Sequence, residues 1–163
     1  MNDEALIGLA GEVGAALGKR GDTLITAESC TGGGIAETLT AIAGASAWFE
    51  AAFVTYSNHA KTELLGVAPE VLVRCGAVSE ETVAAMARGA LARLGADWAI
   101  AISGIAGPAG GSADKPVGTV WIHWSAAHGQ GCSRCFHFEG DRAAVRRQSI
   151  EAALRGLLDA LRS

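Results

Sequence analysis

The sequence predicts an α/β protein, a three-layer α/β/α sandwich whose mixed, mostly parallel sheet ends in an antiparallel hairpin. Segments with apolar residues three or four apart, typical of helices, alternate with short apolar runs, typical of strands. The strand expected at Trp98–Ser103 is almost wholly apolar, as in a sheet covered on both faces. Because no repeat or linker interrupts this order, we expect a single domain over residues 1–163.

Helices and short strands alternate before Trp98. Apolar residues at helical spacing predict helices at residues 6–17, 35–42, 58–65, 69–75 and 79–94, and short apolar runs predict strands at residues 23–27 and 49–56. Asn58 and Ser79 are residue types that cap helix N-termini, and Pro69 favours the first turn of a helix. The acidic Glu80 and Glu81 after Ser79 suit the positive end of a helix dipole.

A hairpin and a helix are expected after the central strand. Residues 119–124 alternate, with Val120, Ile122 and Trp124 on one face, and residues 134–138 pair with them across a glycine-containing loop. Asp141 is placed to cap a last helix. Its buried stripe is expected to consist of Ile150, Leu154, Leu157, Leu158 and Leu161.

Composition and charge narrow the function classes. Half of the residues are hydrophobic, 18% are charged and the net charge is −4, so a polynucleotide-binding surface is not expected. The basic cluster Arg142, Arg146 and Arg147 suits one or two phosphate groups. Neither a signal peptide nor a membrane span is expected, so we expect a cytoplasmic protein whose four cysteines are reduced thiols.

Polar residues follow three of the expected strands, at residues 28–34, 56–61 and 103–111. In α/β sheets, ligands bind beyond the carboxyl ends of the strands. Ser29 precedes a glycine run at a strand-to-helix turn, where backbone amides can hold an oxyanion or a phosphate. Ser29 is therefore either a nucleophile or, in the simpler interpretation, part of a helix cap.

A base for Ser29 can come from the second polar segment. A neutral Lys61 can accept a serine proton and Tyr56 can relay one, although either can also be a surface residue. Cys30 is a rival nucleophile and His59 a rival base. Cys132 and Cys135 lie on opposite faces of an expected strand, and the histidines lack metal-ligand spacing, so we expect neither a metal nor another cofactor.

Several motifs, in order, make the chain recognisable. They are Thr26-Ala-Glu-Ser-Cys-Thr-Gly-Gly33, Thr55-Tyr-Ser-Asn-His-Ala-Lys61, Gly76-Ala-Val-Ser-Glu80, Ser103-Gly-Ile-Ala-Gly-Pro108 with Gly110-Gly111, Lys115-Pro-Val-Gly-Thr-Val120 and Phe138-Glu-Gly-Asp-Arg142. Over nearly its whole length the sequence resembles the CinA C-terminal domain family, the nicotinamide-nucleotide amidohydrolases. One departure is Ala51-Ala52, where many relatives have glycines. If that strand lines the pocket, the added methyl groups narrow it.

The resemblance implies an enzyme that converts nicotinamide mononucleotide and water into nicotinic acid mononucleotide and ammonia, in pyridine nucleotide salvage. It implies Ser29 as nucleophile with Tyr56 and Lys61 as its partners. We expect the substrate to be bound by ten further residues: Cys30, Thr31, Gly32, Gly33, Ser103, Gly104, Gly107, Gly110, Gly111 and Arg142. We also expect a homodimer or larger homo-oligomer. The alternative is a non-catalytic nucleotide-binding module that retains the pocket.

Overall fold

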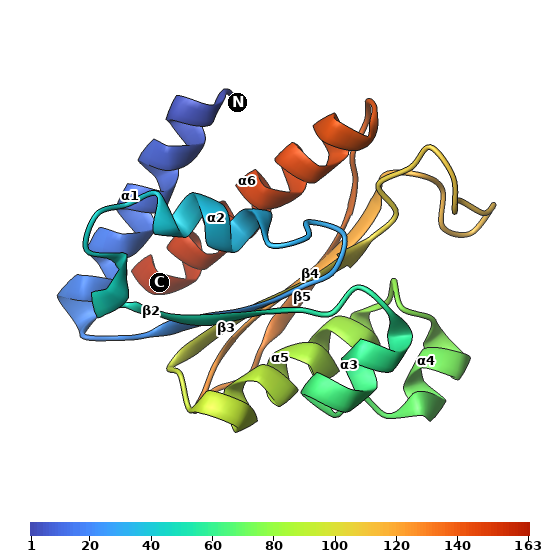
Figure 1. Ribbon diagram of the computed structural model, residues 1–163, viewed down its shortest axis with the longest axis horizontal. Helices are drawn as coiled ribbons and strands as arrows, with labels where there is room; N and C mark the ends of the chain where they lie inside the picture. Colours follow the sequence, from blue (N-terminus) through green and yellow to red (C-terminus); the bar gives the residue numbers. More distant parts are fainter.

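The computed structural model describes all residues 1–163 as an α/β fold (Figure 1). Its elements, in chain order, are α1 (Asp3–Arg20), β1 (Leu24–Glu28), α2 (Gly34–Thr40), η1 (Ala45–Ala47), β2 (Phe49–Val54), α3 (Asn58–Leu65), α4 (Pro69–Cys75), α5 (Glu80–Leu94), β3 (Trp98–Gly104), β4 (Thr119–Ala126), β5 (Cys132–His137) and α6 (Arg142–Arg162). The predicted order of helices and strands is confirmed, and the short 3₁₀ turn η1 is an addition that the sequence pattern did not indicate.

The five strands form one mixed sheet in the order β2-β1-β3-β4-β5. β1 pairs in parallel with β2 and β3, whereas β4 pairs antiparallel with β3 and β5. The expected C-terminal hairpin is therefore β4–β5. Because β1, β2 and β3 run in the same direction, their carboxyl ends meet at one edge of the sheet.

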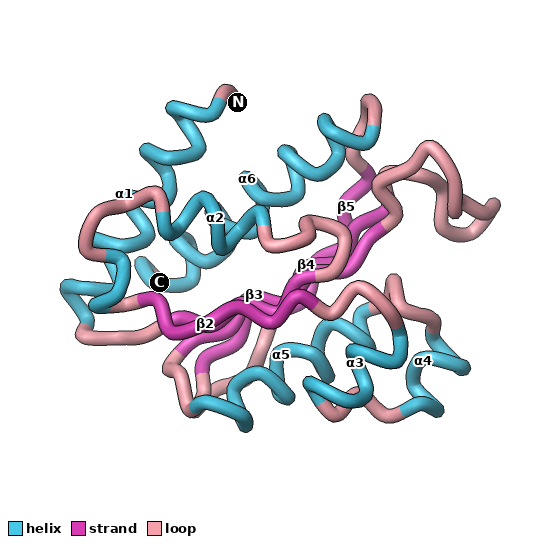
Figure 2. Tube along the Cα trace, in the orientation of Figure 1, coloured by secondary structure: helices cyan, strands magenta, loops and turns pink.

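Helices cover both faces of the sheet, which gives the predicted three layers (Figure 2). α1, α2 and α6 pack on one face around a core that includes Ile100, Ile122 and Leu154. α3, α4 and α5 lie on the other face, where a second core includes Ile25, Met86 and Ala99. Val120, Ile122 and Trp124 share the first core, as their alternation predicted.

Three helix caps show where local sequence patterns succeed and fail. Ser79 and Asp141 cap α5 and α6 as predicted, each accepting a hydrogen bond from the amide three residues later. The cap of α3 is Ser57, whose hydroxyl accepts from the Ala60 amide, and Asn58 is instead the first helical residue. Both are good capping residues, so only the backbone conformation distinguishes them.

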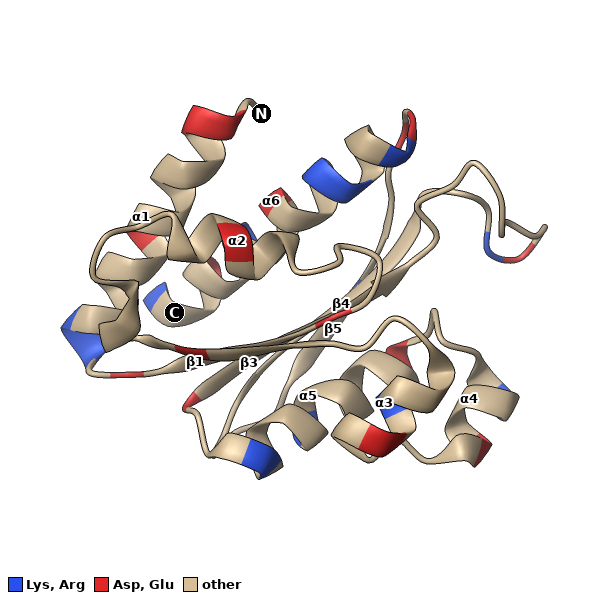
Figure 3. Cartoon of the chain, viewed as in Figure 1, with Lys and Arg blue, Asp and Glu red and all other residues tan.

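Charged side chains of both signs are distributed over the two helical layers, without a continuous basic face (Figure 3). Of the arginines in α6, Arg147, Arg155 and Arg162 each pair with a carboxylate. None of the helices combines the length and the apolar composition needed to cross a bilayer.

Candidate active site

Ser29 and Lys61 meet where the parallel strands end. Ser29 follows β1 directly, and its amide donates to the carbonyl of Ile102 in β3. On the other side, the Thr55 amide donates to the Glu28 carbonyl. Lys61 reaches up from α3, and its Nζ lies 3.1 Å from Ser29 Oγ. Residues 32 positions apart in the sequence thus lie at the distance that Ser-Lys chemistry requires between a nucleophile and its base.

The surroundings of Lys61 favour its neutral form. The side chain is only 1% exposed, and no carboxylate lies within ion-pair distance of its Nζ. Burial lowers the pKa of Lys61 below its ordinary value of 10.5. Its other two contacts are the carbonyls of Thr55 and Tyr56, at 2.8 and 3.4 Å. A neutral amine has two N–H donors for these carbonyls and one lone pair, which can accept the Ser29 proton.

Turn residues, and not helix α2, provide the free backbone donors beside Ser29. Residues 29–33 form this turn, which we call the nucleophile turn. Glu28, fully buried, accepts hydrogen bonds from the Ile35 and Ala36 amides of α2 and from the Thr31 hydroxyl. Its carboxylate therefore already occupies the positive end of the helix. The amides of Cys30, Thr31 and Gly33 have no oxygen acceptor in the chain; Thr31 is wholly buried, whereas Cys30 is 5% exposed and Gly33 is partly exposed.

Tyr56 stands at the rim of the site. It is 60% exposed, and its phenol oxygen accepts a hydrogen bond of 2.8 Å from Arg142 Nη2. Arg142 Nη1 also donates to the Gly107 carbonyl, at 3.0 Å. The last helix thus packs beside the site, and one guanidinium joins the second and third polar segments. Burial, and not a neighbouring cation, is the cause of the lowered Lys61 pKa.

The glycine loop after β3 is only partly at the site. Ser103 is 1% exposed and follows Ile102, the partner of Ser29. At Gly104, a side chain would come within 3.1 Å of Cys30 Sγ, so a glycine lets the two segments approach. Gly107 is held by Arg142. Gly110 and Gly111 are exposed instead, and they lie against the loop's own Ile105 and Val117.

The rival nucleophile and base have unfavourable positions. Cys30 is buried, and this burial raises the pKa of its thiol to about 12, which opposes formation of a thiolate. His59 is exposed and makes no side-chain hydrogen bond, whereas Lys61 contacts Ser29. Ala51 and Ala52 pair with Ile25 and Thr26 in mid-strand, and Ala51 packs against the second core.

Sequence analysis assigned no site role to Glu28 or Thr55, and it placed Arg146 only in a basic cluster that suits phosphate. Glu28 caps α2 from inside the sheet, and Arg146 donates to the carbonyls of Cys30 and Thr31. The Thr55 hydroxyl is buried without a hydrogen-bond partner. The one sequence signal for Glu28 was an acidic residue at the end of an apolar strand, directly before Ser29. A carboxylate buried there needs several hydrogen-bond donors.

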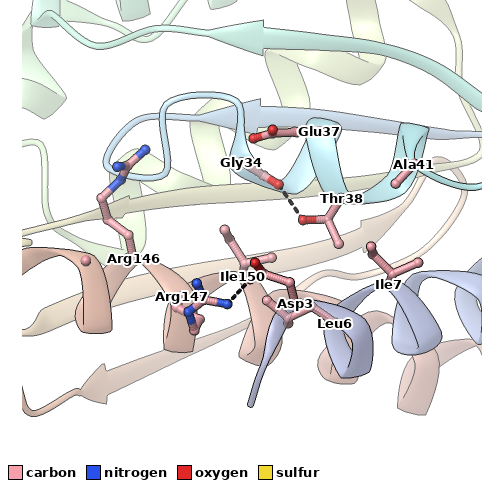
Figure 4. Close-up of a pocket in the computed structure, with 11 residues that line it drawn as sticks. Asp3, Leu6, Ile7, Gly34, Glu37, Thr38, Ala41, Arg146, Arg147 and Ile150 are labelled. Carbon is pink, nitrogen blue, oxygen red and sulfur yellow. Dashed lines mark hydrogen bonds and ion pairs between the residues drawn. The ribbon is translucent and has the colours of Figure 1, made fainter.

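A hollow of about 460 Å³ lies between α1, α2 and α6 (Figure 4). Its lining contains none of the residues Ser29, Tyr56 and Lys61, so it is not the pocket of the nucleophile. Two of the lining residues also adjoin the nucleophile turn: Gly34 follows it in the chain, and Arg146 donates to two of its carbonyls. Nowhere in the chain do three His, Cys, Asp or Glu side chains gather in a metal-binding arrangement.

Comparison with known proteins identifies relatives along the whole chain. Residues 7–161 match the model of the CinA C-terminal domain. The chain is 56% identical over 157 residues to the nicotinamide-nucleotide amidohydrolase PncC of Escherichia coli K12, covering 96% of this chain and 95% of that protein. A protein of the same name from Pseudomonas putida is 58% identical over 155 residues, which cover 92% and 93% of the two chains. The crystal structure of the competence/damage inducible protein CihA from Agrobacterium tumefaciens superposes with a TM-score of 0.94 at 43% identity, covering 100% of this chain and 98% of that one.

Proposed function

This chain belongs to the CinA C-terminal domain family, and from that premise we propose that it is an amidohydrolase that deamidates nicotinamide mononucleotide. The products are nicotinic acid mononucleotide and ammonia, as expected of an enzyme of pyridine nucleotide salvage. Relatives more than half identical over nearly the whole chain carry the name nicotinamide-nucleotide amidohydrolase. We assign this activity to residues 1–163 as one domain.

One observation carries the mechanism: the buried Nζ of Lys61 contacts Ser29 Oγ and has no anionic partner. Lys61 accepts the Ser29 proton while Ser29 Oγ bonds to the carboxamide carbon, and the carbonyl π electrons move to the oxygen. Collapse of the tetrahedral intermediate breaks the C–N bond, and the proton on Lys61 leaves with ammonia. Water, deprotonated by Lys61, then hydrolyses the acyl-serine ester and restores the Ser29 hydroxyl.

The oxyanion that forms in each half-reaction is stabilised by turn amides. Cys30 and Gly33, which are not wholly buried, offer N–H groups without oxygen acceptors beside the nucleophile. Donors fixed in place before the reaction stabilise the developing charge without reorganisation. Gly32 contributes differently: its amide donates to the Ser29 carbonyl, which closes the turn.

Tyr56 and Arg142 border the leaving group and the nucleotide. The phenol of Tyr56 accepts from Arg142, so its own O–H is free to donate to departing ammonia or to the substrate. Arg142 has no carboxylate partner, and its charge suits the phosphate. Gly107 lies beside Arg142, whereas Gly104 and its neighbour Ser103 lie beside Cys30 of the nucleophile turn. Gly110 and Gly111 belong to the phosphate site only if their loop bends toward Arg142 when substrate binds.

Ammonia release tests the proposal directly. We expect nicotinamide mononucleotide to be deamidated with a far higher kcat/KM than free nicotinamide, because phosphate binding remote from the amide positions the carbonyl. Exhaustive chelation with EDTA is the control, and we expect it to leave the rate unchanged because every step uses side chains and backbone of the chain. Binding of the nucleotide without release of ammonia contradicts the proposal and favours the non-catalytic binding module.

Two further expectations accompany this function. We propose a cytoplasmic location, where the thiols of Cys30, Cys75, Cys132 and Cys135 stay reduced. We also propose a homodimer or larger homo-oligomer, which the mass of the protein in solution tests.

A further inference from the structure

Arg146 approaches the nucleophile turn from outside. Its Nε donates to the Cys30 carbonyl at 3.2 Å, and its Nη2 donates to the Thr31 carbonyl at 3.1 Å. The guanidinium also lies close to Gly32, where a side chain would come within 3.4 Å of Nη2. Gly32 has a φ of +59°, a conformation that favours glycine, so this residue suits both the turn and the arginine beside it.

Arg146 makes different contacts from those of the arginines near it on α6. Figure 4 shows Arg146 extending from α6 toward the turn before α2, while Arg147 pairs with Asp3 of α1. Arg155 and Arg162 also pair with carboxylates, whereas Arg146 has none within ion-pair distance. Its charge is therefore directed at two consecutive peptide groups, those joining Cys30 to Thr31 and Thr31 to Gly32.

Peptide geometry transmits this contact to the inner side of the turn. In a planar trans peptide the C=O and N–H bonds point in opposite directions. A carbonyl of Cys30 held toward Arg146 therefore directs the Thr31 N–H away from Arg146. Thr31 is wholly buried, so this N–H points into the protein, whereas the next amide, of Gly32, donates to the Ser29 carbonyl and closes the turn. The cation on the Thr31 carbonyl polarises that second peptide and strengthens the closing hydrogen bond of Gly32.

We propose that Arg146 is a positioning residue for the reaction: by holding the carbonyls of Cys30 and Thr31 it fixes the nucleophile turn, whose Cys30 and Gly33 amides serve as oxyanion donors. This inference rests on the proposed function, and it adds the group that orients the donors. Glu28 holds the turn from the other side, through the Thr31 hydroxyl at 2.6 Å. Thr31 is thus fixed by an anion at its side chain and a cation at its backbone.

The test compares R146M, R146K and the control R147M. We expect R146M to lower kcat by about 10- to 100-fold with little change in KM, because the loss falls on the transition state. R146K keeps the charge but not the two-pronged contact, and its kcat should lie between those of R146M and the wild type. Arg147 was expected in a phosphate-binding cluster, but its guanidinium pairs with Asp3 of α1; R147M removes only this exposed ion pair and should stay within about twofold of the wild type.

A thioamide substrate separates positioning from general damage. Sulfur accepts hydrogen bonds weakly, so a well-placed oxyanion donor makes the enzyme prefer nicotinamide mononucleotide over its thioamide analogue. R146M should reduce this ratio of kcat/KM values, whereas a partly unfolded enzyme loses activity on both substrates equally. If R146M does not fold, as judged by circular dichroism, R146K provides the same ratio.

The outcomes distinguish the inference from the function on which it rests. An active wild type with an unchanged thioamide ratio in R146M and R146K overturns the positioning role alone. A wild type that releases no ammonia from nicotinamide mononucleotide overturns the proposed function and this inference together. A reduced ratio in the Arg146 variants, with an unchanged ratio in R147M, supports both.

Discussion

Two serines of this protein lie within hydrogen-bond distance of a basic side chain, in different parts of the sheet. Ser29 contacts Lys61 at the carboxyl end of β1, and Ser133 contacts His123 Nδ1 at 2.7 Å between β5 and β4. Burial lowers the pKa of both bases, and a positive charge on Arg88 lowers that of His123 further. A neutral base beside a serine therefore does not distinguish the two regions.

Backbone geometry distinguishes them. Ser133 is paired with His123 in the ladder between two strands, and the next residue, Arg134, is paired with Ile122. Ser29 instead begins a turn in which three amides lack oxygen acceptors. β5 is an edge strand, so its own unpaired amides point away from β4 in the plane of the sheet, whereas acyl transfer needs donors that converge beside the nucleophile. The comparison teaches that free N–H groups in a turn directly after the serine are more informative than the serine–base distance.

The largest loss of activity is expected on replacing Ser29, and it should contrast with the result of replacing Ser133. Ser29→Ala should lower kcat by about four to six orders of magnitude, since loss of a nucleophile removes the covalent route. Binding of the nucleotide, measured by calorimetry, should persist. Ser133→Ala is the matched control and should leave the rate of ammonia release unchanged. If Ser29→Ala keeps more than about a tenth of the activity, the assignment of the nucleophile is wrong.

A smaller but still large loss of kcat/KM is expected on replacing Lys61, the proposed base. Lys61→Arg and Lys61→Met should both lower kcat/KM by about 100-fold or more, because arginine keeps the charge but cannot accept a proton at neutral pH. In the wild type, the protonated amine has no lone pair for Ser29. The kcat/KM should therefore rise with pH through the pKa of Lys61, which burial places below 10.5.

The control for the Lys61 variants is a substitution of His123, the basic side chain beside Ser133. His123→Asn keeps a polar side chain opposite Ser133 and should not alter the pH profile of ammonia release. Substantial recovery of activity by Lys61→Arg relative to Lys61→Met would show that Lys61 acts as a fixed charge. Tyr56 or His59 would then be the better candidate for the base.

The smallest effect is expected at Cys30. Its thiol has a pKa of about 12 and no part in the proposed chemistry, so Cys30→Ala should stay within about twofold of the wild-type kcat. Its amide, the part that the mechanism uses, is retained in alanine. An inactive Cys30→Ala with an active Ser29→Ala would reassign the nucleophile to the thiol.

Periodicity predicted most of the fold because each helix or strand packs its own apolar face. The stripe of Leu154, Leu157, Leu158 and Leu161 is buried as expected, whereas Ile150 is only half-buried beside Gly34. The predicted strand ends were wrong by one or two residues: β1 extends to Glu28 instead of Ala27, and β2 ends at Val54 instead of Tyr56. Polar residues after the strands carried the main signal for the site, because parallel strands bring their carboxyl ends together.

Contacts between distant segments were beyond prediction from the sequence. Arg146 reaches carbonyls 116 and 115 residues earlier in the chain, and nothing in the local pattern separates it from Arg147. Which of the two neighbours faces the turn depends on how α6 is rotated against α2. Likewise, Gly110 and Gly111 share a motif with Gly107, but only the shape of the loop shows that they lie against Ile105 and Val117.

The two arginines that reach the site from α6 also determine when it can be assembled during synthesis. Ser29, Tyr56 and Lys61 leave the ribosome long before Arg142 and Arg146, which belong to the last element of the fold. Until α6 docks, the phenol of Tyr56 and the carbonyls of Cys30 and Thr31 lack their guanidinium partners. Before that docking, the turn is held by contacts with earlier parts of the chain alone, such as the one between Glu28 and Thr31. The proposed site is therefore complete only after α6, the last element, has been made.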